Sequence, residues 1–388
     1  MKPGISLALF AAANVALGVT CHGLSGSSPA LAPSQSPNSS GHAASGGSSR
    51  FEPFNSHDSS VEYQVVDLSP AGYRQSCAVG IFGDRIVGWA IPAAQQGNLH
   101  HPMLWSGAEH KPTDLSSSTF IDSAGYGVAY TQTVGCGVSL ASDPCTHAFL
   151  WNSDSEKSID LNPPGFIMSA AEGVSGGKQI GYGLIPTGVP HALLWNSSAQ
   201  NVVDLNPKLF LWSFAYGIWG NSEAGYGKTV GGDTHALLWR STPQSAMDLN
   251  PRKFVQSWAV GICRNQEVGY GEILPDRSVH ALLWTGTPAS CIDLNPKGFL
   301  QSAAIATNGA MQVGRGMPVD SENWHALIWG SQAFIITDLS QYLPKGFTNS
   351  QAVGIDDAGN IVGDAVDSQH HMHTIEWVFQ AGNFTLPE

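Results

Sequence analysis

The sequence predicts an all-β protein, a seven-bladed β-propeller with four antiparallel strands in each blade. The first observation is a repeat, because the segment His-x-x-x-Trp occurs seven times, with steps of 46, 44, 44, 45, 45 and 48 residues between successive Trp. The second is that each unit holds four short apolar segments separated by turn residues, none long enough for a helix. Four strands in about 45 residues is the size of one propeller blade, and seven blades lie within the known range of closed rings.

The third observation is the pattern of the strand faces. In the segment 235–239, His-Ala-Leu-Leu-Trp, alternate residues point to opposite faces, and both faces are largely apolar. Such a strand must be covered on both sides, as in a blade between two neighbours, whereas a β-sandwich shows a cleaner inside-outside alternation. The first two strands of each unit are rich in Gly and Ala, so we place them innermost, next to the crowded axis.

Every unit carries one His, one Trp, one Asp followed by Leu, and one Ser at matching offsets. The His and Trp residues are His101 and Trp105, His147 and Trp151, His191 and Trp195, His235 and Trp239, His280 and Trp284, His325 and Trp329, and His373 and Trp377. The Asp residues are Asp67, Asp114, Asp160, Asp204, Asp248, Asp293 and Asp338, and the Ser residues are Ser76, Ser123, Ser169, Ser213, Ser257, Ser302 and Ser350. One copy falls on each blade, so these side chains cannot converge on a single site. We predict a repeated structural hydrogen-bond network instead, because burying such groups unpaired is costly.

The ring is predicted to be closed by an N-terminal strand. Residues 62–68, which end in the first Asp-Leu pair, precede the first unit and have no blade of their own. We expect them to complete the last blade beside residues 350–377, which removes exposed sheet edges. Residues 383–386, Asn-Phe-Thr-Leu, follow Trp377 at nearly the same offset and are the alternative for that edge, or a fifth strand.

The first 60 residues differ in composition from the rest. Residues 1–21 contain an apolar run after Lys2 and indicate a signal peptide. Cys21 leaves open a lipoprotein signal with a lipid anchor at that residue. Residues 22–60 are Ser, Gly, Pro and Ala, which is typical of a disordered linker, and residues 61–388 form the predicted propeller. We therefore expect a secreted protein, or one held at the cell surface or in the periplasm.

The repeat resembles the family of extracellular HAF repeats, named for the motif His-Ala-Phe. One copy here keeps that triplet, His147-Ala148-Phe149, and most others have His-Ala-Leu. The Asp-Leu, Ala-x-Gly-Ile and Val-Gly signatures also match over about residues 62–380. The resemblance implies export and little about activity. The sequence Asp-Leu-Asn-Pro differs from the Asp-Leu-Gly form of the family, so the following loops are expected to differ.

Composition and charge exclude some classes of partner. Lys and Arg total 17 against 30 Asp and Glu, a net charge of −13, and neutralising nucleic-acid phosphates requires a basic face. No apolar run has the length of a transmembrane span. We predict a monomer that binds no nucleic acid.

No residue pattern predicts catalysis, a cofactor or a metal. Residues 173–177, Gly-Val-Ser-Gly-Gly, fit the nucleophile-elbow pattern but fall on an inner turn without the helix that the motif requires. The cluster His370-His371-Met372-His373 lacks a carboxylate or Cys that would complete a metal site, and His373 belongs to the repeat. The alternative, a carbohydrate-active enzyme on a propeller scaffold, would need carboxylates gathered at one mouth of the channel; the candidates are Asp233, Glu272, Asp276, Asp320 and Glu322.

The cysteines fit an exported protein. Cys136 and Cys145 bracket an insertion in the second unit, and we predict a disulfide between them. Cys263 and Cys291 are a weaker candidate pair, and Cys77 is left as a buried free thiol.

The predicted binding face carries two sets of loops, because antiparallel strands place the loops between second and third strands on the same side as those after Asp-Leu. Each loop after Asp-Leu ends in a Phe at a matching position, which either plugs the gap between blades or contacts a ligand; these are Phe166, Phe210, Phe254, Phe299 and Phe347. The candidate ligand-binding residues on this face are Trp212, Trp258, Trp324, Lys208, Arg252 and Lys297. Aromatic rings beside a few polar groups suit sugars or proteins. We therefore expect a non-catalytic binding or scaffolding propeller for a carbohydrate or an extracellular protein.

Overall fold

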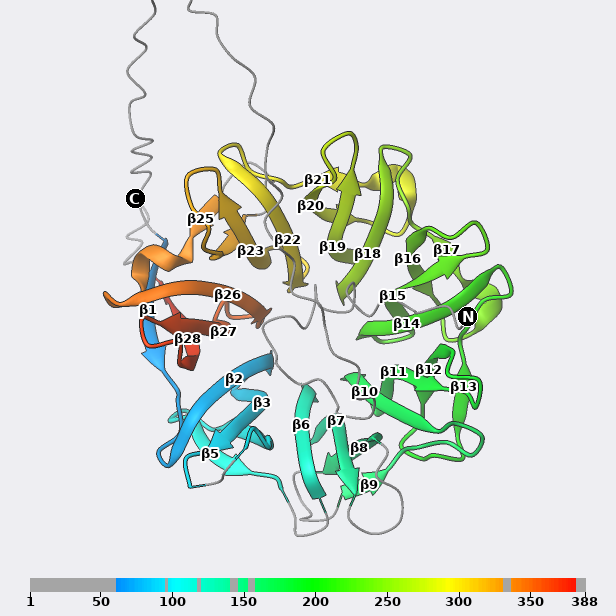
Figure 1. The fold of residues 1–388 in the computed structure, drawn as a ribbon, viewed down its shortest axis with the longest axis horizontal. Coiled ribbons are helices and arrows are strands. Elements are labelled where there is room, and N and C mark those ends of the chain that lie inside the picture. Colours follow the sequence, from blue (N-terminus) through cyan, green and yellow to red (C-terminus); the bar gives the residue numbers. More distant parts are fainter. Residues whose placement is uncertain are drawn as a thin grey trace, which may run out of the picture.

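The structure is a computed structural model that describes residues 61–94, 97–116, 120–139, 146–152, 158–330 and 336–381. Seven four-stranded antiparallel sheets surround one axis, as Figure 1 shows in the view down that axis. The predicted seven-bladed β-propeller is therefore confirmed.

Each blade follows the order of the chain from its innermost to its outermost strand, except that the last blade takes its outermost strand from the N-terminus. Blade 1 consists of β2 (Tyr73–Phe82), β3 (Arg85–Pro92), β4 (His101–Ser106) and β5 (Lys111–Asp114), and blade 2 of β6 (Phe120–Ala129), β7 (Gln132–Ser139), β8 (Thr146–Asn152) and β9 (Ser158–Asp160). Blade 3 consists of β10 (Met168–Ser175), β11 (Lys178–Leu184), β12 (Pro190–Trp195) and β13 (Val202–Asp204), and blade 4 of β14 (Phe210–Trp219), β15 (Ser222–Thr229), β16 (Thr234–Trp239) and β17 (Met247–Asp248).

Blade 5 consists of β18 (Phe254–Cys263), β19 (Gln266–Ile273), β20 (Ser278–Trp284) and β21 (Ile292–Asp293), and blade 6 of β22 (Phe299–Thr307), β23 (Gln312–Pro318), β24 (His325–Trp329) and β25 (Ile336–Asp338). Blade 7 consists of β26 (Phe347–Ile355), β27 (Ile361–Asp367), β28 (Met372–Ala381) and β1 (Val61–Asp67). The 3₁₀ helices are η2 (Pro243–Ser245), η3 (Pro288–Ser290) and η4 (Leu339–Tyr342). In the part of the chain that the structure describes, no helix is long and apolar enough to cross a membrane.

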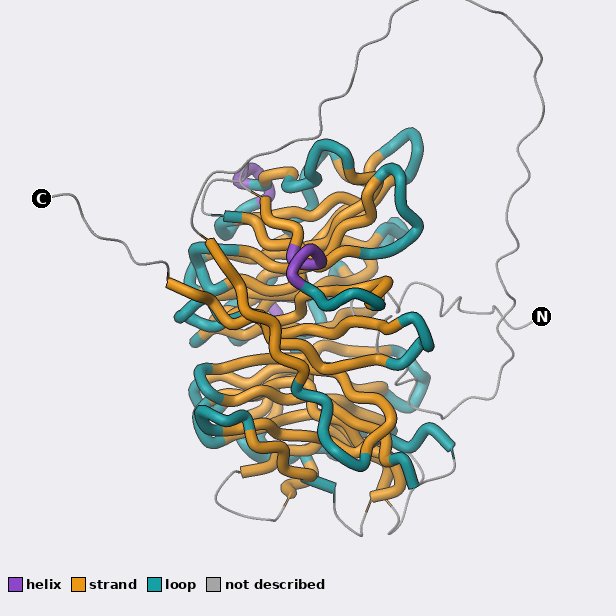
Figure 2. The backbone as a smooth tube through the Cα atoms, turned by 90° about the vertical axis from the view of Figure 1, so that its left-hand side faces the viewer, coloured by secondary structure: helices purple, strands orange, loops and turns teal. Residues whose placement is uncertain are grey.

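Seen from the side, the strands run between two faces where the loops gather (Figure 2). We call one of them the junction face. It carries the loops between the second and third strands of each blade and the loops that lead from one blade into the next. The opposite face carries the remaining hairpin loops.

The Gly of the Val-Gly signature is required by the close approach of the two inner strands. An ideal Cβ placed on Gly225 of β15 would lie 2.0 Å from the carbonyl oxygen of Phe214 on β14. A Cβ placed on the equivalent Gly of each other blade would lie 1.8–2.0 Å from a carbonyl oxygen of the innermost strand. Any larger residue would push the inner strand away, which explains why each unit keeps this Gly.

The core lies between the blades. The Trp of every unit is buried, and each cluster of apolar side chains joins adjacent blades, as when Trp195 and Leu193 of blade 3 pack with Leu150 of blade 2. In five blades the indole N–H donates to the carbonyl of the Leu in the preceding Asp-Leu pair, at 2.9–3.1 Å; these Trp are Trp105, Trp239, Trp284, Trp329 and Trp377. Apolar burial and an inter-blade hydrogen bond therefore act through the same side chain.

The ring is closed by β1, as predicted. This strand pairs with β28 in antiparallel register from Val61 opposite Ala381 to Asp67 opposite Ile375. The alternative closing segment, residues 383–386, lies outside the described residues.

Candidate functional site

The recurring His and Asp form one pair in every blade. The His Nδ1 lies 2.7–3.0 Å from a carboxylate oxygen of the Asp on the neighbouring outer strand. The other Asp oxygen accepts the backbone N–H two residues later, for example that of Asn250 from Asp248 at 2.8 Å. Each Asp therefore holds both the third strand of its blade and the start of the loop into the next blade.

The recurring Ser joins one blade to the preceding one. Its buried hydroxyl accepts the backbone N–H of the residue after the His, at 3.0–3.1 Å for Ala148, Ala192, Ala236, Ala281 and Ala326, and at 3.3 Å for Thr374. Ser123 differs because Pro102 occupies the donor position and has no N–H to give. The recurring Ser therefore bonds to the backbone of the preceding blade, and it does not contact the His–Asp pair of its own unit.

The predicted ligand-binding residues separate into two groups. Lys208, Arg252 and Lys297 are exposed on the junction face. Trp258 is 5% exposed and stacks on Tyr270 at 5.0 Å between ring centres, so its assignment as a surface contact is wrong. Trp258 belongs to a cluster of aromatic side chains that extends across blades 3 to 6. Its indole is buried because this cluster offers more apolar contact than a position on the surface.

The other two predicted Trp are half-buried. Trp212 packs edge-on against Phe214 in the same aromatic cluster, with ring centres 5.5 Å apart. The ring of Trp324 lies 4.6 Å from the guanidinium carbon of Arg315. The recurring Phe side chains pack into the inter-blade clusters, which favours the structural interpretation of them; they are Phe166, Phe210, Phe254, Phe299 and Phe347.

One position of the second strand varies from blade to blade, and its two charged members are connected by hydrogen bonds. The residues at this position are Trp89, Cys136, Tyr182, Tyr226, Tyr270, Arg315 and Asp364. Gln351 links the two charged ones, because it accepts from Arg315 Nη1 at 3.1 Å and donates to Asp364 at 2.8 Å. The Cys77 thiol donates to the same Asp364 oxygen at 3.4 Å. Burial raises the pKa of the Asp364 carboxyl to about 6, although these hydrogen bonds and the Arg315 charge lower it.

A second departure from the repeat leaves space between blades. At four junctions the Asn of Asp-Leu-Asn-Pro accepts from the recurring Ser at 2.6–2.7 Å and donates to the Phe carbonyl at 3.1–3.4 Å; these are Asn162, Asn206, Asn250 and Asn295. Ser stands at this place at the other three junctions: Ser116 between blades 1 and 2, Ser340 at the start of a longer loop between blades 6 and 7, and Ser69 between blades 7 and 1. Cavities of about 130 Å³ and 220 Å³ lie at the junctions of Ser69 and Ser340, respectively.

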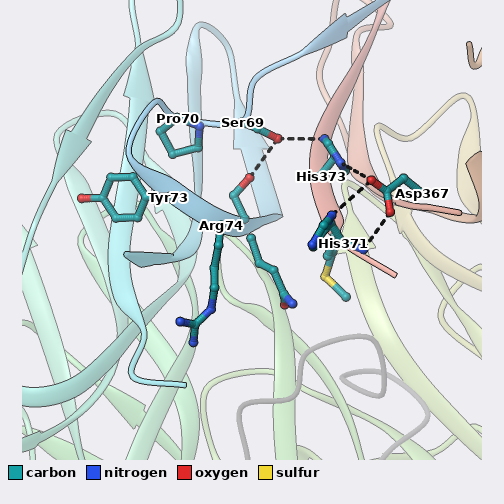
Figure 3. A pocket seen from close by; sticks show the side chains of 10 residues that line it. Ser69, Pro70, Tyr73, Arg74, Asp367, His371 and His373 are labelled. Atoms are coloured by element: carbon teal, nitrogen blue, oxygen red, sulfur yellow. Dashed lines mark hydrogen bonds and ion pairs between the residues drawn. The ribbon is translucent and has the colours of Figure 1, made fainter. Parts of the chain in front are cut away.

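The cavity between blades 7 and 1, the closure pocket, is shown in Figure 3. It is lined by Ser69, Pro70, Tyr73, Arg74, Gln75, Ser76, Asp367, His371, Met372 and His373. Ser76 donates to Ser69 at 3.3 Å, a longer bond than any Ser–Asn bond at the four Asn junctions. The pocket therefore lies where the shorter Ser side chain replaces the carboxamide.

A carboxylate lies beside the His cluster, which the sequence did not indicate. Asp367 Oδ2 is 3.4 Å from both His371 Nδ1 and His373 Nε2. Hydrogen bonds from the backbone N–H groups of His371 and Gln369 lower the pKa of Asp367 to about 2, so it is anionic. Among the described residues, no group of three or more His, Cys, Asp or Glu side chains is placed to hold a metal ion.

The carboxylates considered for catalysis have other partners or stand alone on loops. Glu272 is buried and forms an ion pair with Arg277 at 2.6 Å. Asp276 accepts from the backbone and hydroxyl of Ser278. Asp233, Asp320 and Glu322 are exposed.

The cysteines are only partly described. Cys77, Cys263 and Cys291 are free thiols, so the weaker candidate pair Cys263–Cys291 does not form a disulfide. The predicted Cys136–Cys145 disulfide involves Cys145, which lies outside the described residues. Cys77 is buried, as expected.

Exposed aliphatic side chains gather on the junction face. Of the 14 large apolar residues exposed in the described part of the chain, eight lie on this face over blades 2 to 6, and two lie on the opposite face. We call the eight the apolar arc: Ile121, Ile167, Leu209, Leu211, Val230, Leu274, Leu300 and Val319. Blades 7 and 1 have Thr348 and Arg74 at the position of Leu211, so the arc ends on either side of the closure pocket.

Comparison with known proteins shows the fold alone. The chain matches no family model and no curated protein sequence. The β-propeller domain of the trilobed protease from Pyrococcus furiosus, described as having an open velcro topology, is similar over 84% of this chain and 100% of that domain, with a TM-score of 0.56 and 8% identity.

Two peptidases are similar to this chain over about half of their own length. A puromycin-hydrolysing peptidase from Mycobacterium tuberculosis matches 83% of this chain and 55% of its own length, with a TM-score of 0.51 and 10% identity. The acylaminoacyl peptidase from Pyrococcus horikoshii matches 83% and 52%, with a TM-score of 0.51 and 8% identity. The chain spans about half the length of these enzymes, and identities this low carry no information about activity.

Proposed function

We propose that the chain is a non-catalytic binding or scaffolding propeller that receives an extracellular protein on its junction face. The observation that carries this proposal is the apolar arc. Leu209 is 74% exposed, Val230 68% and Val319 60%, and the arc continues over five successive blades. Grouped exposed apolar side chains are typical of protein interaction surfaces, whereas scattered single ones need no explanation.

The rigidity of the scaffold supports the same proposal. Leu209 and Val230 belong to different loops, and a backbone hydrogen bond from Val230 to Leu209 of 3.4 Å joins them. Val319 is fixed in the same way by a bond of 2.9 Å to the carbonyl of Gly298, two residues before Leu300. A preorganised surface loses little conformational entropy on binding.

The route to the outside of the cell is a further part of the proposal, and it depends on sequence. Residues 1–21 as a signal peptide, residues 22–60 as a tether and the likeness to HAF repeats all favour export. A secreted or surface-held platform would present its junction face to other extracellular proteins. Processing at or near Cys21 in the native host, read by mass spectrometry of the mature N-terminus, tests export.

The experiment compares two variants of the full chain. Leu211→Ser with Leu300→Ser removes two members of the arc, and Val203→Ser with Ile292→Ser makes the same change on outer strands, where both residues are also exposed. Extracellular proteins from the host are cross-linked to each variant and identified. Loss of a partner only in the arc variant supports the proposal; a partner retained by the arc variant, or turnover of a polysaccharide by the chain, contradicts it.

A further inference from the structure

We propose that the closure pocket binds an N-acetylated amino sugar through its acetamido group. This inference is independent of the protein partner proposed for the apolar arc. It starts from what the pocket lacks relative to the other junctions. Between blades 5 and 6, Ser302 donates to Asn295 at 2.6 Å, and Asn295 donates to the Phe299 carbonyl at 3.3 Å.

The missing group is a carboxamide, and the loop itself is unchanged. The segment from Asp67 to Tyr73 has the same length as that from Asp293 to Phe299, and Pro and Gly occupy the same places in both. A Ser replaces the Asn at position 69, so the space comes from the side chain. The cavity measures about 130 Å³. One water molecule occupies roughly 30 Å³, so the cavity has room for a small functional group.

The groups around this space are complementary to an amide. The Ser69 hydroxyl accepts from Ser76 and can itself donate to a carbonyl oxygen, and Asp367 is an acceptor for an amide N–H. Pro70 and Met372 provide apolar surface for a methyl group. Figure 3 shows Ser69 and Pro70 on one side of the pocket and Asp367 with the His residues on the other.

Charge favours a neutral ligand. Asp67 and Asp367 both lie at this junction, so an anion would be repelled. Arg74 also lines the pocket, but its single guanidinium charge, held by the Gly97 carbonyl and Asn98, offsets only one of these two carboxylates. Half-exposed His371 is left at the mouth, where it can contact the hydroxyls of a sugar ring that remains outside.

The test is a ligand-observed nuclear magnetic resonance titration of the full chain with N-acetylglucosamine. Glucose, which lacks the acetamido group, is the matched ligand, and N-acetylasparagine amide tests a peptide source of the amide. The main variant is Ser69→Asn, which restores the carboxamide of the other junctions and should fill the pocket without harming the fold. Asn295→Ser opens the equivalent space between blades 5 and 6, where Ile273 stands at the register position of Asp367.

The proposal predicts that N-acetylglucosamine binds the wild type more tightly than glucose does, and that Ser69→Asn weakens this binding by at least about tenfold. Asn295→Ser should leave the affinity of the wild-type site unchanged. Equal binding of glucose, unchanged binding by a folded Ser69→Asn variant, or no binding of N-acetylglucosamine would overturn the proposal. Preference for N-acetylasparagine amide would overturn the sugar and assign the pocket to peptides.

Discussion

The imidazole Nδ1 of His373 lies 2.9 Å from a carboxylate oxygen of Asp67, although 306 residues separate the two along the chain. Six other blades contain the same pair between neighbouring strands of one unit. The first strand of the propeller therefore enters the last blade by making the contact that every outer strand makes. The ring is therefore closed by the same His–Asp contact that joins the third and fourth strands of the other blades.

Asp67→Ala should loosen this closure. The change removes the contact with His373 and the acceptor of the Ser69 N–H. Because Asp67 is nearly half exposed, we expect a loss of only about 1 kcal/mol in the free energy of unfolding. Hydrogen exchange of the β1 amides should rise together with this loss. Asp84→Ala, at an exposed hairpin turn, is the control, and an equal effect of both changes would contradict a specific role for Asp67.

Gly225→Ala should disrupt blade 4. The new Cβ would lie 2.0 Å from the Phe214 carbonyl oxygen, so the inner strand must move. We expect a loss of about 3 kcal/mol or more, measured by denaturant unfolding. Gly231→Ala makes the same change on an exposed loop, where the nearest atom is 3.5 Å away, and should be close to neutral. A tolerated Gly225→Ala would show that the inner strands are packed less closely than described.

Ser169→Ala should weaken the junction between blades 2 and 3. It leaves the buried Ala148 N–H without its acceptor and removes the donor to Asn162. A loss of about 1 to 2 kcal/mol is expected. The matched change is Ser123→Ala, which should cost less because Pro102 offers no N–H at that junction. Equal losses in thermal unfolding would argue against the inter-blade bond as the reason for the Ser.

Asp364 should make the stability of the ring depend on pH. Burial raises its pKa from 3.8 to about 6, so between these values the folded state keeps a proton that the unfolded chain has lost. The free energy of unfolding should therefore fall as pH rises from about 4 to about 6, by about 3 kcal/mol from this group, and level off above. The Asp364→Asn variant should lack this component. Identical pH profiles of unfolding for the two proteins would contradict the assignment.

The architecture could be predicted because its causes recur in every unit. The spacing, the turn residues and the apolar faces indicate a four-stranded blade in each of the seven units. The number of blades and the closing strand could therefore be predicted from the sequence. The position of Trp258 could not be predicted, because its burial depends on Tyr270 and on aromatic residues of other blades that occur only in part of the ring. Local pattern carries no information about such contacts.

The candidate site was missed for a related reason. Ser69 in place of Asn was visible in the sequence as Asp-Leu-Ser-Pro, but its meaning depends on knowing that Asn bonds to both Ser and the Phe carbonyl at other junctions. Asp367 is the last residue of β27 and has no acidic counterpart in the other units, so only folding brings it beside His373. Departures from a repeat are informative once the role of the regular residue is known.

The central claim is that regular repeat residues maintain the ring, and that departures from the repeat form the site. Thermal unfolding of Ser69→Asn and Asn295→Ser, measured side by side, tests it most directly. The account predicts opposite shifts: Ser69→Asn gains about 1 kcal/mol because a carboxamide fills the closure pocket, and Asn295→Ser loses a similar amount. Loss of stability in Ser69→Asn would contradict the claim, since Ser69 would then be a structural requirement of its own junction.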